Sequence, residues 1–225
     1  MEPMSRQTPR TRGRMVAGAA DLIRRRGVNA TSFREVVRHT QTPRGSIGHH
    51  FPRGKRQLVE EAVTYAGLEV SRPLERLMSE QGAIVGLRAF IGLWRSVLEG
   101  SHFEAGCPVL AVAVEQYIGD DDVPLAGAPD RLLALAKDVF ADWQRIIAAA
   151  LRRDGVSAAR ARRLAALVVA SVEGTVALCR VERTAAPLDD VSVELEIALS
   201  AAVKSRLAGR SARGTGQTQL GGDTR

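Results

Sequence analysis

The chain has 225 residues, of which 45% are hydrophobic, and a formal net charge of +7. This length is sufficient for one large domain or for a small and a medium domain, and the hydrophobic fraction is sufficient for a packed core. The composition therefore excludes a disordered chain. Because few stretches alternate polar and apolar residues with a period of two, we expect almost no β-strand and an all-α fold.

The positive charge is concentrated at one end of the chain. Residues 1–56 contain 13 Lys and Arg residues but only three acidic ones, Glu2, Asp21 and Glu35, which gives a balance of +10. The remaining residues therefore sum to −3. A basic segment on a mildly acidic body is typical of a nucleic-acid-binding protein that has a separate second function.

The sequence contains none of the motifs that would indicate an enzyme, a cofactor site or a metal site. Its two cysteines, Cys107 and Cys179, are far apart and lack the spacing of zinc ligands. We find no nucleophile–base arrangement and no glycine-rich nucleotide-binding loop. We therefore expect a protein that is not an enzyme and that binds neither a metal nor a cofactor.

The N-terminal segment does not resemble a secretion signal. Residues 15–23 are amphipathic and include Asp21, whereas a signal peptide has an uninterrupted apolar centre. No apolar run approaches the length of a membrane span. These features predict a cytoplasmic protein with reduced thiols and no membrane partner.

The first predicted helix follows a polar tail. Residues 1–9 contain proline and are expected to be disordered, and a helix is expected from about Arg10 to Arg26, with Gly27 as its C-cap. Arg12 and Arg14 lie at the start of this helix. We expect them to reach phosphates of a nucleic acid, the alternative being a solvated helix end.

The next stretch, Ser32 to Phe51, predicts two short helices separated by a tight turn. Ser32 and Glu35 form a capping-box pattern at the start of the first helix. Thr42 is a good N-cap for the second helix, and Pro43 would occupy its first position. Ile47 and Phe51 give the second helix one buried face. Its other face carries small or hydrogen-bonding side chains: Arg44, Gly45, Ser46, Gly48 and His49.

This arrangement favours DNA binding. A short helix behind a perpendicular one can enter the major groove with its N-terminal residues. The alternative is an ordinary helical hairpin with a solvated polar face. The preceding helix and the concentrated positive charge favour the first interpretation.

The segment TPRGSIGHHFPRGK, which is Thr42 to Lys55, resembles the recognition-helix signature of the TetR family of bacterial repressors. The Pro-Arg-Gly-Ser form is similar to the branch that includes the LmrA and YxaF regulators. The resemblance is best from Arg14 to about Val63. Three residues depart from the family pattern. Gln41 replaces the turn glycine, Val37 replaces an alanine, and Gly48 replaces a tyrosine that commonly touches the DNA backbone.

The resemblance implies a three-helix DNA-binding domain at residues 10–54 and a larger helical domain at residues 55–208 that binds an effector and forms a homodimer. It implies a repressor that binds a pseudo-palindromic operator in double-stranded DNA and is released by a small, largely apolar effector. Two alternatives are a DNA-binding protein of the same fold without an effector and a small-molecule-binding protein that no longer reads DNA.

The residues expected to contact DNA fall into two groups. Arg44 and Ser46 are expected at base edges, because Arg can bind guanine O6 and N7 together, and Pro43 can contact a thymine methyl. Phosphate contacts are expected from Ser32, His49, His50 and Lys55, with partial burial as the alternative for His50. The full set is Arg12, Arg14, Ser32, Thr42, Pro43, Arg44, Gly45, Ser46, His49, His50 and Lys55.

The remainder of the chain predicts a helical body. Helices are expected from Lys55 to about Ser79 with a kink at Pro73, from Ala83 to Leu98, from Cys107-Pro108 through Tyr117, from Asp130 to Arg153, from Ala158 to Arg183, and from Val191 to Leu207. Asp120 to Pro129 is expected to be a loop. Residues 209–225 are rich in Gly, Ser and Thr and are expected to be a disordered tail.

The last two predicted helices are apolar on more than one face. The first is rich in small residues, and the second carries a stripe of Leu195, Leu199, Val203 and Leu207. The resemblance implies that the two helices form a four-helix bundle with those of a second subunit. The alternative is that they only complete the core of one subunit.

Aromatic side chains are spread over the predicted helices of the body. Each one singly is expected in the core, but together the resemblance implies that they enclose an effector cavity with a few polar groups. Glu173 is the best polar candidate, with burial at the dimer interface as its alternative. Cys107 is expected to be a small buried residue or, alternatively, a redox-sensing thiolate. The candidates are Phe90, Trp94, Phe103, Cys107, Tyr117, Phe140, Trp143 and Glu173.

Overall fold

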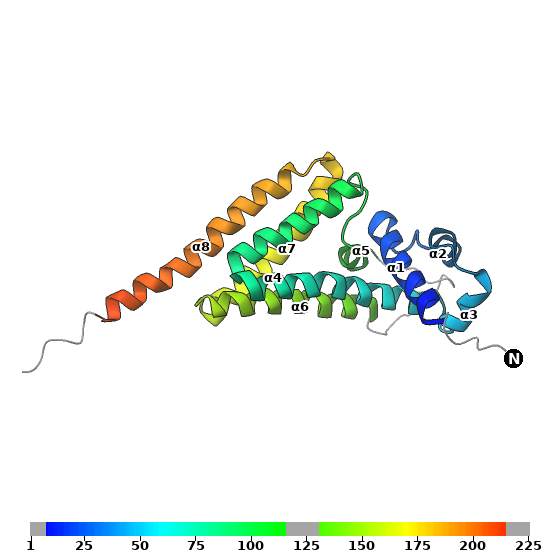
Figure 1. Cartoon of the computed structure of the whole chain (residues 1–225), viewed down its shortest axis with the longest axis horizontal. Helices are drawn as coiled ribbons and strands as arrows, with labels where there is room; N and C mark the ends of the chain where they lie inside the picture. The colour runs from blue at the N-terminus through cyan, green and yellow to red at the C-terminus, as the bar shows by residue number, and fades with distance from the viewer. Residues whose placement is uncertain (1–7, 116–130, 215–225) are drawn as a thin grey trace, which may run out of the picture.

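The structure is a computed structural model that describes residues 8–115 and 131–214. Every regular element within these two ranges is helical, and no strand occurs in them. The all-α expectation is therefore confirmed. The helices form a small N-terminal headpiece at one end of an elongated helical body, as Figure 1 shows.

The headpiece consists of α1 (Thr8–Arg26), α2 (Phe33–Thr40), a short 3-10 turn η1 (Arg44–Ser46) and α3 (Ile47–His50). Helix α1 begins two residues before the predicted start. Gly27 follows its end with a φ of 85°, which confirms the predicted glycine C-cap. Gly18 lies where α1 meets the end of α2, and a Cβ at this position would overlap the Thr40 methyl group. The absence of a side chain at Gly18 therefore allows the two helices to approach closely.

The long element α4 (Gly54–Gly100) consists of two helical arms that meet at Gly82. Gly82 has a φ of 77° and a ψ of 178°, a conformation that is accessible essentially only to glycine. Asp154 accepts a hydrogen bond of 2.7 Å from the backbone N–H of Ala83 and so satisfies the start of the second arm. The chain remains helical through Pro73, so the non-helical dihedral angles lie at Gly82, between the two helices predicted there.

The remaining elements are α5 (Pro108–Val114), α6 (Arg131–Arg153), α7 (Ala158–Glu182) and α8 (Ala186–Gly214). Helix α5 begins after Cys107 as predicted but ends at Val114. Tyr117 and the predicted loop at residues 120–129 lie outside the described residues. Helix α8 continues to Gly214, so the prediction of a disordered tail from residue 209 is wrong for residues 209–214.

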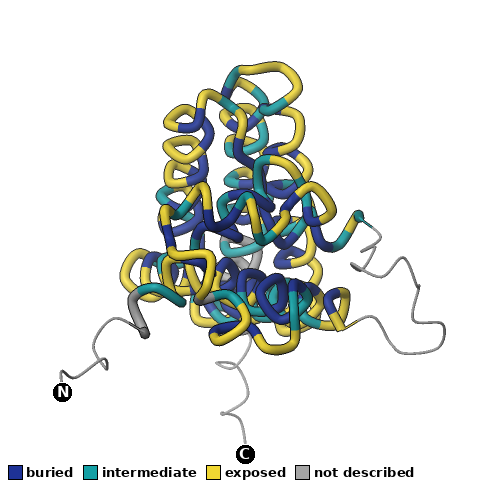
Figure 2. The backbone as a smooth tube through the Cα atoms, turned by 90° about the vertical axis from the view of Figure 1, so that its right-hand side faces the viewer, coloured by how far each residue is buried: buried dark blue, intermediate teal, exposed yellow. Residues whose placement is uncertain are grey.

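The body is layered around the two arms of α4. Helix α6 lies along the first arm, α7 packs on α6, and α8 packs on α7 and on α4 (Figure 1). The Trp143 indole N–H donates to the carbonyl of Gly67 at 3.4 Å and joins α6 to the first arm. The buried residues line the inward sides of these helices, and the exposed ones line the outer turns (Figure 2).

Helix α7 corrects the expectation that no apolar stretch approaches the length of a membrane span. It is long and apolar enough by length and composition, and half of its most apolar window is buried inside the protein. One side of this helix packs in the core, and apolar side chains such as Leu167 and Leu178 also lie on its exposed side. Such a helix is weak evidence for a membrane span, because core helices of soluble proteins meet the same criterion.

Candidate DNA-binding face and effector cavity

The recognition segment begins one residue later than the sequence predicts. Pro43 is the N-cap of η1 with a φ of −65° and a ψ of 131°, so it precedes the first turn instead of occupying it. Thr42 is buried, and its hydroxyl lies 2.9 Å from the hydroxyl of Thr40. The prediction of Thr42 as the helix cap is therefore wrong, because its hydroxyl points inward to another side chain. A DNA contact by its side chain would require this residue to become exposed.

The local signals around α2 are confirmed. The Ser32 side chain accepts from the backbone N–H of Glu35, and the Glu35 carboxylate accepts from the backbone N–H of Ser32. Gln41, which replaces the family's turn glycine, has a φ of 51° and lies in the left-handed region. The turn is therefore formed as in the family pattern, with a non-glycine residue in the conformation that glycine would take most easily.

The outer face of the recognition segment is exposed and carries few large side chains. Arg44, Gly45, Gly48 and His49 are exposed, and a Cβ added at either glycine would contact no other group within 4 Å. The Arg44 side chain forms no hydrogen bond or ion pair within the described part of the chain. The side chain of Ser46 lies outside the described part. The exposed face leaves room for the close approach of another molecule.

Two residues expected at phosphates are buried. His50 and Lys55 are each only 7% exposed. Burial, together with the charges of His49 and Arg12, lowers the pKa of His50 and favours its neutral form. The structure therefore places His50 as in its alternative interpretation, under the recognition segment. Lys55 has little exposed surface to offer a phosphate.

The two arginines at the start of α1 have partners inside the protein. Arg12 forms an ion pair of 2.6 Å with Glu61, and its guanidinium lies 5.5 Å from the centre of the Phe51 ring. Arg14 donates to the carbonyl of Thr40 at the end of α2. These contacts fasten α1 to its neighbours, so a phosphate contact by either arginine would have to replace them. Arg34 and Arg38, which the sequence reasoning did not select, are exposed on α2.

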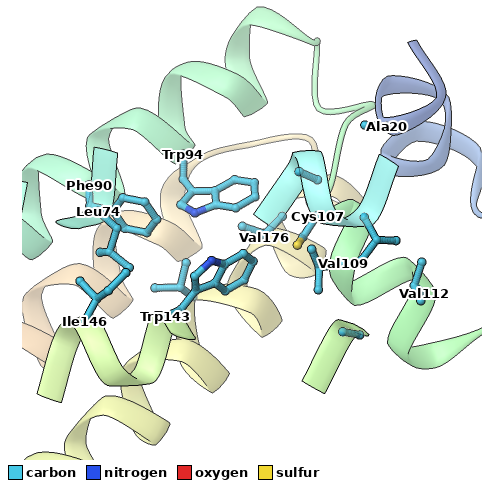
Figure 3. Packing of buried hydrophobic residues seen from close by; sticks show 14 of the residues in the cluster. Ala20, Leu74, Phe90, Trp94, Cys107, Val109, Val112, Trp143, Ile146 and Val176 are labelled. Atoms are coloured by element: carbon cyan, nitrogen blue, oxygen red, sulfur yellow. The ribbon is translucent and has the colours of Figure 1, made fainter. Parts of the chain in front are cut away.

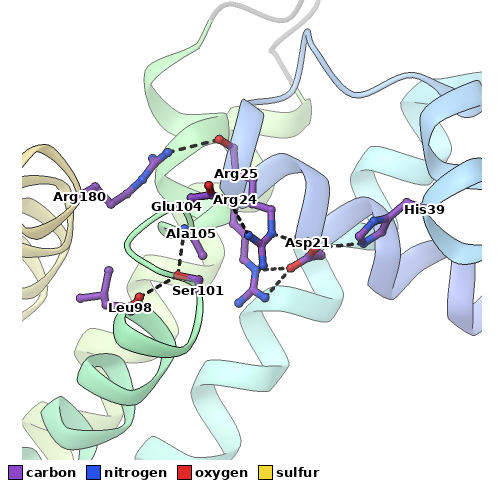
Figure 4. A network of polar contacts seen from close by, with 9 residues as sticks. All are labelled: Asp21, Arg24, Arg25, His39, Leu98, Ser101, Glu104, Ala105 and Arg180. Carbon is purple, nitrogen blue, oxygen red and sulfur yellow. Dashed lines mark hydrogen bonds and ion pairs between the residues drawn. The ribbon is translucent and has the colours of Figure 1, made fainter. Parts of the chain in front are cut away.

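Asp21 holds together the basic end of α1. Its carboxylate accepts hydrogen bonds from Arg24 at 2.7 Å and from Arg25 at 3.1 Å, and it lies 3.0 Å from Nε2 of His39 on α2 (Figure 4). Burial alone would raise the pKa of Asp21, but the bonds and charges of the two arginines lower it below its usual value. Part of the basic surplus of the headpiece is therefore neutralised internally.

The body contacts the C-terminal end of α1 through several hydrogen-bonded connections, one of which runs from the Arg25 guanidinium to the Glu104 carboxylate at 3.3 Å. The backbone N–H of Gly106 donates to the carbonyl of Arg24 at 2.9 Å. The Arg180 side chain on α7 donates to the carbonyl of Arg25 at 3.3 Å, as Figure 4 shows. Just after α1, the Glu115 carboxylate accepts from the backbone N–H groups of Val28 and Asn29 at 3.0 and 3.3 Å. The end of α1 is therefore in direct contact with α7 and with residues that flank α5.

Aromatic side chains from two elements line a small, partly open cavity in the interior of the body. Phe90 and Trp94 on the second arm of α4 face Trp143 on α6, with Leu74 beside them (Figure 3). The cavity has a volume of about 20 Å³. Its lining consists of Val70, Leu74, Phe90, Trp94, Trp143, Ile147, Val168, Val169, Val172 and Glu173. Three of the predicted effector residues are thus brought together around one predicted polar group.

A larger open cleft of about 430 Å³ lies between α1 and α4. It shares Val70, Phe90 and Trp94 with the internal cavity, so these side chains form the wall between the two hollows. Its other lining residues are Ala17, Ala20, Asp21, Arg24, Tyr65, Ala66, Glu69, Pro73, Leu93, Val97, Gly106 and Pro108. One wall of the cleft is therefore a helix of the headpiece, which the sequence did not indicate.

The other aromatic candidates lie farther from the cavity lining. Phe140 is half-buried and packs edge-on against Trp143, with ring centres 5.3 Å apart. Phe103 is half-buried at the end of α4 and lines neither of the two hollows. Tyr117 lies outside the described residues. The predicted set is therefore only partly assembled by the described structure.

Glu173 is the one acidic residue in the lining of the internal cavity. Its Oε2 atom is buried and has no hydrogen-bond partner within the described structure. Burial raises the pKa of Glu173 to about 7, and a hydrogen bond with the Cys107 side chain opposes part of that shift. The same burial, together with the charge of Glu173, raises the pKa of the Cys107 thiol well above its usual value. Both effects disfavour the thiolate at Cys107, so they favour its interpretation as a small buried residue.

The apolar surface of the last two helices differs from the predicted stripe. Leu195 and Leu199 are 3% and 0% exposed within the single chain, because α8 packs against α7 and α4. The part of the predicted stripe at Leu195 and Leu199 therefore faces the core of its own chain and is not available to a second subunit. Large apolar side chains remain exposed on the other side of the two helices: Leu167, Leu178 and Val181 on α7, and Val193 and Ile197 on α8.

Comparison with known proteins places both parts of the chain. Residues 16–62 match the family described as bacterial regulatory proteins, tetR family, and residues 83–194 match the LmrA/YxaF-like transcriptional regulator C-terminal domain. An uncharacterised HTH-type transcriptional regulator of Mycobacterium tuberculosis is 40% identical over 195 residues, which cover 87% of this chain and 97% of the relative. The HTH-type transcriptional regulator LmrA of Bacillus subtilis is 25% identical, and the match covers 81% of this chain and 93% of LmrA.

Solved structures show the same fold. The regulatory protein TetR from Rhodobacter sphaeroides superposes with a TM-score of 0.71 at 19% identity, over 84% of this chain and 98% of that one. A TetR transcriptional regulator from Chloroflexus aurantiacus gives a TM-score of 0.67 at 26% identity, and the match covers 87% of this chain and 96% of that one. Members of this family bind DNA and typically dimerise. The chain therefore belongs to the TetR family of bacterial transcriptional regulators, with an LmrA/YxaF-like C-terminal domain.

Proposed function

We propose that the protein is a homodimeric cytoplasmic repressor that binds a pseudo-palindromic operator and is released by a small, largely apolar effector. The observation that carries this proposal is the cleft between α1 and α4. It joins the headpiece to the aromatic lining of the body, because Val70, Phe90 and Trp94 border both the cleft and the internal cavity. A molecule that entered there would contact the DNA-binding part and the body together.

Arg44 is the residue proposed to read the operator. It is exposed at the first turn of the recognition segment, where side chains of a helix–turn–helix motif reach base edges in the major groove. Ser46 is proposed beside it, and Pro43 at a thymine methyl. Ser32 and His49 are proposed at phosphates, and the exposed Arg34 and Arg38 of α2 supplement them. The buried Lys55 and His50 are proposed to support the segment from behind.

The dimer is proposed to form through the exposed apolar sides of α7 and α8. Leu167, Leu178 and Val181 on α7 and Val193 and Ile197 on α8 would be removed from water by a second copy. Two α7–α8 pairs would then form a four-helix bundle with two-fold symmetry. Such a dimer presents its two headpieces to half-sites about one DNA turn apart, roughly 34 Å.

The effector is proposed to act by a shift in population. Helix α1 forms one wall of the cleft and is also fastened to the body by Gly106 and Arg180. A ligand that requires a wider cleft binds better to the state in which α1 is displaced. The displaced headpieces no longer fit both half-sites. A ligand that bound both states equally would shift nothing, so differential affinity is the essential property.

The DNA-binding part of the proposal is tested by competition binding. An operator is first selected from a pool of random duplexes with the wild-type protein, and single-base variants of it are then compared. Arg44→Ala is expected to lose about 1–3 kcal/mol of discrimination at one base pair per half-site and little affinity for non-specific DNA. Arg34→Ala, in contrast, is expected to weaken all sequences alike.

Arg160→Ala serves as the matched control, because Arg160 is an exposed arginine at the start of α7 in the body. It is expected to bind as the wild type does. If Arg44→Ala discriminates at every position as the wild type does, the proposed orientation of the recognition segment is wrong. If no duplex is enriched by the wild-type protein, the proposal of operator binding fails.

A further inference from the structure

One carboxyl oxygen of Glu173 is a buried polar atom without a hydrogen-bond partner in the described structure, although the carboxyl also hydrogen-bonds with the Cys107 side chain; Nε of Arg180 is likewise buried without a partner. Glu173 is 6% exposed, and its unpartnered oxygen is Oε2. No Lys or Arg of the described residues forms an ion pair with it. Buried carboxyl oxygens are normally paired, because removing such a group from water without a partner costs several kcal/mol. An orphan of this kind at a cavity indicates a missing partner.

The surroundings of Glu173 indicate the charge of that partner. Glu173 shares its cavity with the rings of Phe90, Trp94 and Trp143. Aromatic faces attract cations and do not attract anions, and a carboxylate forms its strongest hydrogen bonds with charged donors. The rest of the lining is aliphatic, so it favours an apolar body. A bound anion would meet a buried acid without any compensating basic residue among the lining side chains.

We propose that the effector site takes an apolar molecule with one basic nitrogen, whose ammonium group donates a hydrogen bond to Oε2 of Glu173 between Trp94 and Trp143. This assignment rests on the proposed effector response and names the ligand class of that site. The pKa of about 7 for Glu173 means that the carboxyl is partly ionised near neutral pH. A bound cation would favour the ionised form further.

The ligand needs more room than the internal cavity offers. About 20 Å³ accommodates one water molecule at most, whereas small-molecule sites typically measure about 300–1,000 Å³. The adjacent cleft provides about 430 Å³. Movement of Phe90 and Trp94, which form the wall between the two hollows, would join them. The ammonium group would then lie at Glu173 while the apolar part filled the cleft against α1.

The two tryptophans of the chain make this site directly observable. The sequence contains two Trp residues, and both Trp94 and Trp143 line the cavity beside Glu173. Intrinsic fluorescence of the full-length protein therefore reports on this site. We would titrate it with three matched compounds that differ only in the polar group: 4-tert-butylbenzylamine, 4-tert-butylbenzyl alcohol and 4-tert-butylbenzoate.

The amine is expected to bind the wild-type protein about tenfold or more tightly than the alcohol, with the benzoate weakest. Glu173→Gln keeps the shape of the side chain but removes its charge. In this variant the preference for the amine is expected to fall to about threefold or less, while the Kd of the alcohol changes little. Glu69→Gln, which removes a carboxylate from the outer cleft, is the matched control and is expected to keep the full preference.

Three results would overturn the assignment. The first is equal binding of the amine and the alcohol by the wild-type protein, which requires no variant to fold. The second is an unchanged preference in Glu173→Gln. The third is the absence of any fluorescence change with all three compounds at millimolar concentration. Loss of the preference in Glu69→Gln instead would move the ammonium group into the outer cleft and would also overturn it.

The same titrations, repeated with a labelled operator duplex, separate this assignment from the proposed function. If the amine binds at Glu173 but the operator stays bound, the effector response fails and the ligand class stands. If the amine and the alcohol both release the operator, and do so equally in Glu173→Gln, the effector response stands and the ligand class fails.

Discussion

Nη2 of Arg180 donates a hydrogen bond of 3.3 Å to the carbonyl oxygen of Arg25, and this bond joins α7 to the last turn of α1. The last carbonyls of a helix have no partner within it and carry partial negative charge, so a cationic donor is well placed there. Arg180 follows Glu173 by two turns on the same helix. Helix α7 thus connects the proposed effector site with the end of the headpiece helix.

Replacing Arg180 by Gln is expected to loosen this connection. The variant loses a charge-assisted hydrogen bond, which contributes about 1–3 kcal/mol to stability. We expect faster amide hydrogen exchange at residues 24–29, while α6 keeps its protection. Arg152→Gln is a control at an exposed arginine far along α6. Unchanged exchange at residues 24–29 would show that the Arg180 contact does not hold the headpiece.

Glu173→Gln is expected to change how stability depends on pH. In the folded chain burial raises the pKa of Glu173 from 4.5 to about 7. Below pH 4.5 Glu173 is protonated in both the folded and the unfolded chain, so no free energy is lost by burying a charge. As the pH rises from 4.5 to about 7, Glu173 loses its proton in the unfolded chain before it does so in the folded chain. The free energy of unfolding of the wild type therefore falls over this range.

The loss is complete above pH 7 and amounts to roughly 3 kcal/mol. Urea unfolding at acidic and at mildly alkaline pH should therefore show Glu173→Gln gaining on the wild type as pH rises. The exposed Glu69→Gln should show no such gain. A difference between wild type and Glu173→Gln that is independent of pH would mean that Glu173 is not held in its protonated form.

The proposed dimer interface is tested by charges on the exposed sides of α7 and α8. Leu178 and Ile197 are 51% and 57% exposed in the single chain. The double variant Leu178→Glu, Ile197→Glu should keep its helical circular dichroism but sediment as a monomer, because the charges would be buried without partners in the interface. Specific operator binding should be lost with it.

Two further leucines provide the controls. Leu68 on α4 is 45% exposed, and Leu68→Glu should remain a dimer. Leu199 is fully buried within the chain, and Leu199→Glu should destabilise the fold by more than about 3 kcal/mol. A folded double variant that still sediments as a dimer would place the interface elsewhere.

Operator affinity is expected to fall steeply with salt. Residues 1–56 carry a charge balance of +10, and binding to phosphates releases condensed counterions. The dimer should show a log–log slope of at least about −4. Arg34→Ala should reduce the magnitude by about one unit per subunit, as measured by fluorescence anisotropy over a range of salt concentrations. A slope near zero would contradict the electrostatic basis of DNA binding.

The sequence by itself determined the local features of the headpiece. The capping box of Ser32 and Glu35, the C-cap at Gly27 and the tight turn at Gln41 all depend on residues within four positions of each other. Such short-range interactions can be read from the order of the residues. The charge separation between headpiece and body is likewise a property of sequence. These features were sufficient to predict the helix–turn–helix segment, and the scarcity of period-two alternation was sufficient to predict the all-α fold class.

Only the tertiary structure decided which side of each apolar helix faces inward. Helix α8 has apolar residues all around, so its pattern did not show that Leu199 is buried while Ile197 is exposed. The ion pair between Arg12 and Glu61 joins residues 49 positions apart. It occupies the guanidinium group of an arginine that the sequence analysis expected at a phosphate. The unpaired oxygen of Glu173 depends on the same kind of information. Its Oε2 atom is buried without a partner because α4, α6 and α7 pack around one cavity. Burial of this kind is set by all the helices together and not by neighbours in the chain.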